Sequence, residues 1–119
     1  MKMKSIALML LILLMVTAGC TKTEKKITVA SKPHTEQYIL AEIISQLIEN
    51  KTDIKVERKL GIGGGTSNIH PAMLKGDVDI YPEYTGTAWL FVLKEEPGKT
   101  KEPMYDALKK AYSEKFHIK

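Results

Sequence analysis

From residue 27 onward the sequence alternates strand-like and helix-like patterns, and this alternation constrains the fold more than any other feature of the chain. Residues 27–31 form a short β-branched run, and residues 54–60 alternate apolar with charged side chains, so both segments predict strands. Between them, the apolar residues of 36–50 recur with helical spacing and predict an amphipathic helix. Thr35 is its predicted N-cap.

The following segment continues the alternation. A glycine-rich loop at 61–65 precedes a short predicted helix at 66–75. Val78 and Ile80 then predict a third strand, which stops at Pro82 because proline has no N–H to donate.

The last part of the chain holds an apolar run and an amphipathic segment. Residues 88–93 are expected to pack against the rest, and residues 104–112 predict a last helix. The resulting β-α-β-α-β-α order predicts an α/β domain with a largely parallel sheet. A chain of 119 residues has room for one such small domain.

The first 19 residues have the composition of a secretory signal peptide. Lys2 and Lys4 form a basic start, and residues 6–18 are uncharged and dominated by Leu, Ile, Met and Val. This run is shorter than the about 20 apolar residues that a membrane-spanning helix needs. A buried core helix is the alternative, but such helices show a polar face and this run has none. We therefore predict that residues 1–19 are removed after export.

The only cysteine follows this apolar run directly. Residues 17–20 (TAGC) resemble a bacterial lipobox, although Thr17 stands where Leu is usual. We expect a lipid on Cys20, which would anchor the chain on the extracytoplasmic face of the cell membrane. An ordinary signal peptide followed by a free thiol is the alternative. Residues 20–26 predict a flexible tether, and the folded domain is expected at residues 27–119.

Charge and histidine spacing exclude two classes of function. The formal net charge is +4, and removal of Lys2 and Lys4 would leave +2, which is too mild to indicate nucleic-acid binding. The histidines share no metal-ligand spacing with carboxylates or with the cysteine, so we expect no metal and no cofactor. They are interpreted as surface or packed residues: His34, His70 and His117.

Three polar groups of residues remain as candidates for chemistry. Asp77 and Asp79 would share one face of a strand, but nothing near them supplies a nucleophile or an oriented base. The loop at 61–65 lacks the lysine of a P-loop, and both a tight turn and close approach of a ligand to backbone N–H groups explain its glycines. The loop at 81–87 follows a predicted strand, where open α/β sheets bind ligands. Its tyrosines and carboxylate suit a cation without hydrogen-bond donors, or else the tyrosines only pack.

Three motifs, taken in order behind the lipobox, resemble one family. They are Ser31-Lys32 with residues 35–40 (TEQYIL), residues 64–67 (GGTS) and residues 76–87 (GDVDIYPEYTGT). Together they resemble the osmoprotectant-binding lipoproteins of ABC importers, which take up glycine betaine, carnitine and choline. The resemblance covers nearly the whole segment after the leader.

This resemblance implies an α/β lobe of the periplasmic-binding-protein class (type II, Venus-flytrap), incomplete in this chain. It implies a quaternary ammonium ligand held by a cage of tyrosines, membrane subunits of an ABC importer as partners, and no enzymatic activity. The ligand carboxylate would be bound by the N–H groups of 63–65 or by the Thr66 hydroxyl. The ligand-binding candidates on matching positions are Gln37, Thr66, Tyr84 and Thr87, with Ser67, Asp79 and Tyr81 behind them.

Two features depart from the family pattern. Pro71 lies inside the predicted short helix, where it removes an intrahelical hydrogen bond. The chain also ends before a second lobe, so we expect a truncated form that binds weakly or not at all by itself. The alternatives are a surface lipoprotein remnant that binds nothing, and a binding protein for another small solute such as an amino acid.

Overall fold

The computed structural model describes residues 24–100 and 102–118, so the predicted signal peptide at 1–19 and the lipidation site Cys20 lie outside the described residues. The first strand, β1, spans Lys26–Ala30. It therefore begins at the last residue of the predicted tether, one residue before the predicted start of the domain. None of the helices in the described part of the chain is long and apolar enough to cross a membrane.

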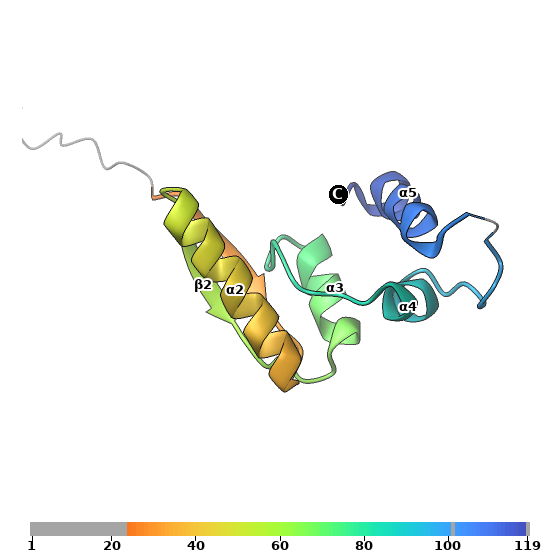
Figure 1. Ribbon diagram of the computed structural model, residues 1–119, viewed down its shortest axis with the longest axis horizontal. Coiled ribbons are helices and arrows are strands. Elements are labelled where there is room, and N and C mark those ends of the chain that lie inside the picture. The colour runs from red at the N-terminus through yellow and green to blue at the C-terminus, as the bar shows by residue number, and fades with distance from the viewer. Residues whose placement is uncertain (1–23, 101, 119) are drawn as a thin grey trace, which may run out of the picture.

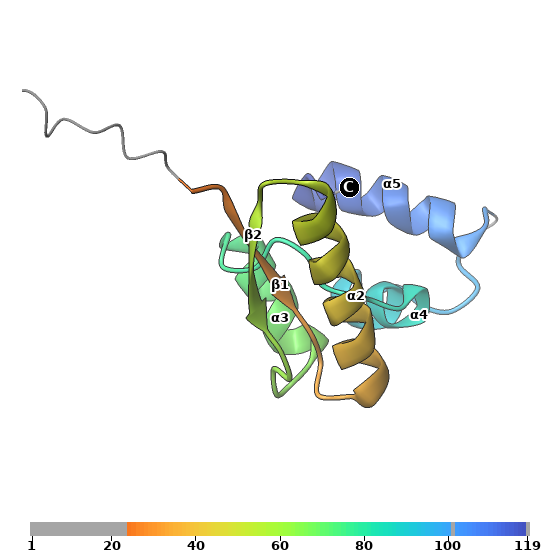
Figure 2. The ribbon, with the colours of Figure 1, turned by 60° about the vertical axis from the view of Figure 1, so that its left-hand side comes forward.

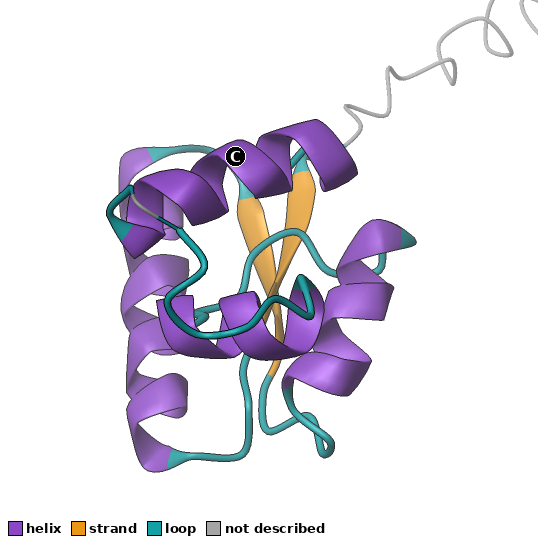
Figure 3. Cartoon of the chain, turned by 90° about the vertical axis from the view of Figure 1, so that its right-hand side faces the viewer, coloured by secondary structure: helices purple, strands orange, loops and turns teal. Residues whose placement is uncertain are grey.

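A parallel βαβ unit forms the first half of the fold. Strand β1 pairs with β2 (Lys55–Lys59), in a register that sets Lys26 opposite Lys55 and Ala30 opposite Lys59. Helix α2 (Thr35–Lys51) connects them, as parallel strands require a crossover. The two strands lie between α2 and the next helix, α3 (Thr66–Leu74) (Figures 1 and 3).

Helix α2 differs from the sequence prediction at its start and on its buried face. Thr35 is the first helical residue and not the N-cap, because His34 holds the extended backbone of the cap position (φ −129°, ψ 142°). The face packed on the sheet carries Gln37, Ala41 and Ser45. Much of the predicted apolar stripe is exposed instead, since a two-stranded sheet covers only one side of the helix: Ile39, Ile43 and Leu47.

Arg58 links β2 to α2. Its guanidinium donates to Glu42 Oε2 at 2.9 Å and to Glu49 Oε2 at 2.7 Å. Hydrogen bonds from Arg58 hold the pKa of both carboxyls below its usual range. This three-residue cluster fixes the helix along the strand that it covers (Figure 2).

The core lies between β1 and α3. Ala30, Ile69 and Val78 are almost fully buried against each other. Helix α3 continues through Pro71 to Leu74 despite the lost hydrogen bond. Burial of Ile69 on its inner face stabilises this short helix, as tertiary packing usually does.

The predicted third strand is reduced to a single parallel bridge between Val29 and Ile80. Ala30 donates to the Ile80 carbonyl at 2.8 Å, and the Asp79 N–H donates to the Thr28 carbonyl at 2.9 Å. Pro82 follows directly and has no N–H, so the ladder cannot extend.

The helical turn α4 (Thr85–Thr87) runs into the π-helix η1 (Ala88–Val92). Ala88 and Trp89 are buried, and the Trp89 indole donates to the Glu96 carbonyl at 2.9 Å. The expected packing of residues 88–93 is thus present at three of its positions, Ala88, Trp89 and Leu93, whereas Leu90 and Phe91 are exposed.

The last helix, α5 (Met104–Phe116), crosses the same end of the molecule as α3 and α4 (Figure 3). Tyr112 and Phe116 meet the His70 ring edge-on, with centroids 5.6 and 4.8 Å away. His70 is buried as expected for a packed histidine, while His34 and His117 are exposed.

Candidate ligand-binding site

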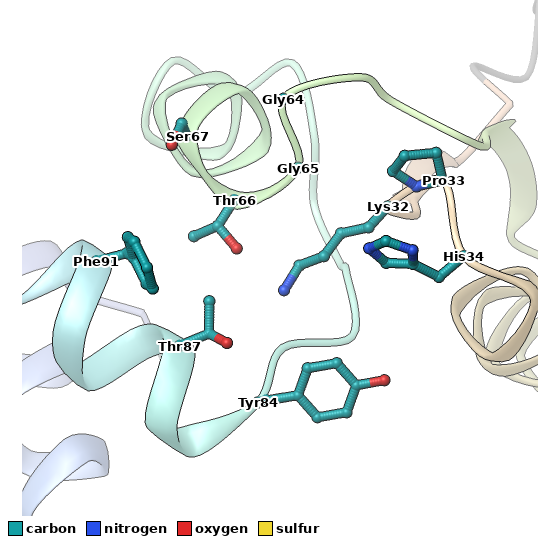
Figure 4. Close-up of a pocket in the computed structure, with 10 residues that line it drawn as sticks. All are labelled: Lys32, Pro33, His34, Gly64, Gly65, Thr66, Ser67, Tyr84, Thr87 and Phe91. Carbon is teal, nitrogen blue, oxygen red and sulfur yellow. The ribbon is translucent and has the colours of Figure 1, made fainter.

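A pocket of about 570 Å³ opens where three segments converge. The segments are the turn after β1, the glycine loop with the start of α3, and the α4–η1 helix (Figure 4). Its lining residues are Lys32, Pro33, His34, Gly64, Gly65, Thr66, Ser67, Tyr84, Thr87 and Phe91.

The glycine loop brings backbone close to this pocket. Gly65 is the N-cap of α3 and has a φ of +54°, a left-handed region that favours glycine. A Cβ added there would contact the Lys32 aliphatic chain at 3.7 Å. The first N–H groups of α3, from Thr66 and Ser67, have no acceptor within the helix. Such groups are suited to binding an anion. The loop therefore serves as a turn and also lines a cavity.

Glu83 binds three residues that line the pocket. Its Oε2 accepts a hydrogen bond from the Thr66 hydroxyl at 2.6 Å, and its Oε1 accepts one from the Tyr84 N–H at 2.9 Å. Lys32 forms an ion pair with the same carboxylate. The side chains of Lys32 and Glu83 are only 7% and 13% exposed, so this pair is shielded from bulk water.

One face of the α4–η1 helix carries the apolar and hydroxyl groups of the pocket. Tyr84, Thr87 and Phe91 are spaced i, i+3 and i+7, and all three line the cavity. The Lys32 ammonium lies 5.2 Å from the centroid of the Tyr84 ring, within the range of a cation–π interaction. Figure 4 shows the Lys32 side chain extending between Thr66 and Thr87. The face thus offers aromatic rings beside a fixed cation.

Four of the seven ligand-binding residues proposed from the sequence line this pocket: Thr66, Ser67, Tyr84 and Thr87. They come from two separate segments, and only the fold brings them together. Their exposure differs, because Thr66 is buried while Tyr84 remains 41% exposed.

The other three proposed residues do not line the pocket. Asp79 binds the Thr28 N–H at 2.7 Å, so its carboxylate is used in pairing with β1. Tyr81 packs against the core cluster. Gln37 is fully buried at the first turn of α2, and neither atom of its amide has a hydrogen-bond partner in the described structure. Gln37 lies close enough to Tyr84 to lower the pKa of its phenol, although Glu36 and burial outweigh this effect and the net pKa is raised.

Three ring-bearing side chains, His70, Tyr81 and Tyr112, have buried polar atoms and are influenced by the Glu83 charge. Burial raises the pKa of the Tyr112 phenol to about 12, with a further contribution from the Glu83 charge. Burial, followed by Glu83, also raises the pKa of Tyr81. Burial lowers the pKa of His70, whose ring nitrogens have no hydrogen-bond partner among the described residues. The three side chains are therefore favoured in their neutral forms.

Sequence reasoning did not propose Lys32, His34 or Phe91 as site residues, and it considered the Glu83 carboxylate only as a partner for a cation. Phe91 was detectable, because it extends the i, i+3 spacing of Tyr84 and Thr87 by one turn. Lys32 and Glu83 are 51 positions apart and meet only in the folded chain. In the described ranges, no group of three or more His, Cys, Asp or Glu residues is arranged to hold a metal ion.

Comparison with known proteins identifies similar sequences over most of this domain. The family model described as substrate binding domain of ABC-type glycine betaine transport system matches residues 25–119. The ergothioneine transport permease/ergothioneine binding protein EgtU of Helicobacter pylori (strain G27) is 50% identical over 95 residues, which are 80% of this chain and 17% of that protein. The carnitine transport binding protein OpuCC of Listeria monocytogenes is 37% identical over 127 residues, 98% of this chain and 41% of that protein.

The glycine betaine-binding protein YehZ of Escherichia coli (strain K12) is 34% identical over 90 residues, 74% of this chain and 29% of that protein. A crystal structure of a glycine betaine/carnitine/choline ABC transporter superposes with a TM-score of 0.67 at 25% identity, over 79% of this chain and 35% of that one. The chain thus spans between 17% and 41% of the length of these curated relatives. The superposition confirms the periplasmic-binding-type α/β fold that the sequence predicts.

Proposed function

This chain belongs to the family of substrate-binding domains of ABC-type glycine betaine transport systems, and on that premise we propose that it forms part of a receptor for quaternary ammonium solutes. The family serves transport and is not an enzyme family. The observation that carries the proposal is the pocket, where aromatic rings, a buried ammonium and free helix N–H groups converge.

The aromatic side of the pocket suits the head group of such a solute. A trimethylammonium group has no N–H to donate, so it is recognised by ring faces and by a diffuse negative field. Tyr84 and Phe91 supply the rings, and each favourable cation–π contact contributes about 0.5 to 2 kcal/mol. Thr87 lies between them and presents a hydroxyl group.

The part of the pocket around Lys32 and the start of α3 suits a carboxylate. Lys32 is the ammonium that lines it, and the N–H groups of Thr66 and Ser67 open the helix α3 beside it. A betaine carries both a trimethylammonium group and a carboxylate, which matches the two sides. The names of three relatives give glycine betaine, carnitine and ergothioneine as their ligands. Each of these molecules carries both a trimethylammonium group and a carboxylate.

The wider arrangement follows from the same premise. We propose a Venus-flytrap receptor in which this chain supplies most of one half of the cleft, and closure around the ligand requires a second lobe. Cys20 would carry the lipid that holds it on the extracytoplasmic face of the cell membrane, close to the membrane subunits of its importer.

Calorimetry with matched ligand pairs tests the proposal. The chain is measured alone and as a completed receptor, in which it is followed by the rest of the binding domain of the Helicobacter pylori relative. Glycine betaine and glycine differ only in N-methylation, so the completed receptor is expected to bind the first and not the second. Choline and carnitine extend the series.

Each outcome decides between the alternatives. No heat and no thermal shift with any quaternary ammonium solute would discard the proposal, and in that case binding of glycine would favour an amino-acid receptor. The chain alone is expected to bind weakly or not at all, because half of the enclosing surface is missing. Micromolar affinity of the chain alone would contradict this expectation.

A further inference from the structure

The Glu83 carboxylate binds three donors from different segments of the chain. It accepts from the Thr66 hydroxyl and the Tyr84 N–H and pairs with the Lys32 ammonium. These donors come from three segments: the turn after β1, the start of α3 and the start of α4. Glu83 does not itself line the pocket, but two of its side-chain partners, Lys32 and Thr66, do.

This arrangement limits what Thr66 can do for a ligand. A threonine hydroxyl has one proton to donate and two lone pairs. The proton is directed to Glu83 Oε2 at 2.6 Å, so only lone pairs remain on the pocket side. A ligand carboxylate therefore gains no hydrogen bond from the Thr66 hydroxyl while Glu83 stays in place. This hydrogen bond argues against the carboxylate-binding role that the resemblance suggested for Thr66.

The same arrangement leaves Lys32 available. An ammonium has three N–H donors and Glu83 Oε1 takes one of them, so the others can bind a ligand. A buried ammonium is stable only when it is paired, because desolvation penalises a lone charge. Lys32 is 7% exposed and lies over the Tyr84 ring, so its position depends on its carboxylate partner.

We propose that Glu83 is a positioning residue, which fixes Lys32 beside Tyr84 and so makes Lys32, and not the Thr66 hydroxyl, the side chain that recognises a ligand carboxylate. This inference rests on the proposed function. Glu83 acts through Lys32 and need not touch the ligand. Its removal is expected to weaken carboxylate-bearing ligands selectively.

Nuclear magnetic resonance tests the positioning without any ligand. In the chain labelled with ¹³C at the lysine ε carbon, the Lys32 ε protons are expected upfield of the other lysines because the Tyr84 ring is close. Lys32→Arg assigns the signal. Glu83→Gln is expected to move it to the position of an exposed lysine, whereas Glu36→Gln, which removes an exposed acid near Tyr84, should leave it unchanged. An upfield Lys32 signal that persists in Glu83→Gln would overturn the proposal.

A double-mutant cycle tests the effect on recognition in the completed receptor. Glu83→Gln is expected to weaken glycine betaine by about tenfold or more and choline, which has no carboxylate, by about twofold at most. In a Lys32→Met background, Glu83→Gln should cause no further loss of glycine betaine affinity. Equal losses for both ligands, a gain for glycine betaine, or the same loss in both backgrounds would refute a role through Lys32.

The two arms separate the inference from its premise. If the unmodified completed receptor binds neither ligand, the proposed function fails. The lysine spectra then decide by themselves whether Glu83 positions Lys32. If the receptor binds glycine betaine but the cycle shows no coupling, the proposed function stands and the inference about Glu83 falls.

Discussion

Truncation of Ile69 is expected to remove a large part of the stability of this small domain. Ile69 is fully buried on α3 and packs against Ala30 and Val78. Ile69→Ala removes about three carbon groups, and at about 0.8 kcal/mol for each buried CH₂ the lost transfer free energy is about 2.4 kcal/mol. The cavity left behind adds about 1 kcal/mol, which brings the total to about 3 to 4 kcal/mol.

The same substitution at Ile39 provides a matched control. Ile39 is 55% exposed on α2, so Ile39→Ala removes few contacts, and the better helix preference of alanine offsets part of that loss. We expect a change within about 0.5 kcal/mol. The two variants have identical composition and differ only in which isoleucine is shortened.

Urea unfolding of the chain measures both effects. Helix content is followed by circular dichroism, and tertiary packing by the fluorescence of the single tryptophan, Trp89. The difference in unfolding free energy between the two variants is expected to be about 3 kcal/mol, at equal dependence on urea. A difference below about 1 kcal/mol would refute the assignment of Ile69 to the core.

Three further substitutions test the lipid anchor at Cys20, the pocket-lining ring of Phe91 and the buried His70. Cys20→Ser is expected to release the protein from membranes in cell fractionation, and continued membrane retention would contradict the anchor. Phe91→Ala should weaken glycine betaine about tenfold in the completed receptor by calorimetry, whereas Leu90→Ala, which changes a neighbouring exposed side chain outside the pocket, should not. Because burial lowers the pKa of His70 below 6.5, the unfolded state binds the proton more readily. Stability is therefore expected to fall as the pH drops from about 7 to about 5, above the range where the carboxylates titrate. His70→Gln should flatten this dependence in urea titrations, and an unchanged slope would show that another group titrates.

The sequence predicted the order of elements well and their partners less well. The spacing of apolar residues in 36–50 locates α2 to within one residue at each end. It does not show which side is covered, because Ile39 and Leu47 have the right period for burial and yet are exposed. Hydrophobic period fixes a face relative to the helix axis, whereas burial depends on how many strands the sheet supplies.

The site shows the same division. Residues adjacent in sequence, such as Thr66 and Ser67, line the pocket together because one loop motif contains both, and their contact with a ligand stays a prediction. Asp79 does not line the pocket, and its strand-like alternation gave no sign that its carboxylate accepts a hydrogen bond from the Thr28 N–H. The pairing of Lys32 with Glu83 depends on three elements converging, and no local pattern encodes such a distance.

The burial of that ion pair has a consequence for the medium in which the pocket works. Mobile ions screen exposed charges over about 10 Å at 0.1 M salt and over about 3 Å at 1 M, but they screen a shielded pair much less. Lys26 and Glu57, which are 56% and 40% exposed, form a pair that concentrated salt weakens. Lys32 and Glu83 are largely out of reach of those ions. When the external salt concentration rises, the exposed ion pair Lys26–Glu57 is therefore weakened. The Lys32–Glu83 ion pair beside the pocket keeps its strength and its position.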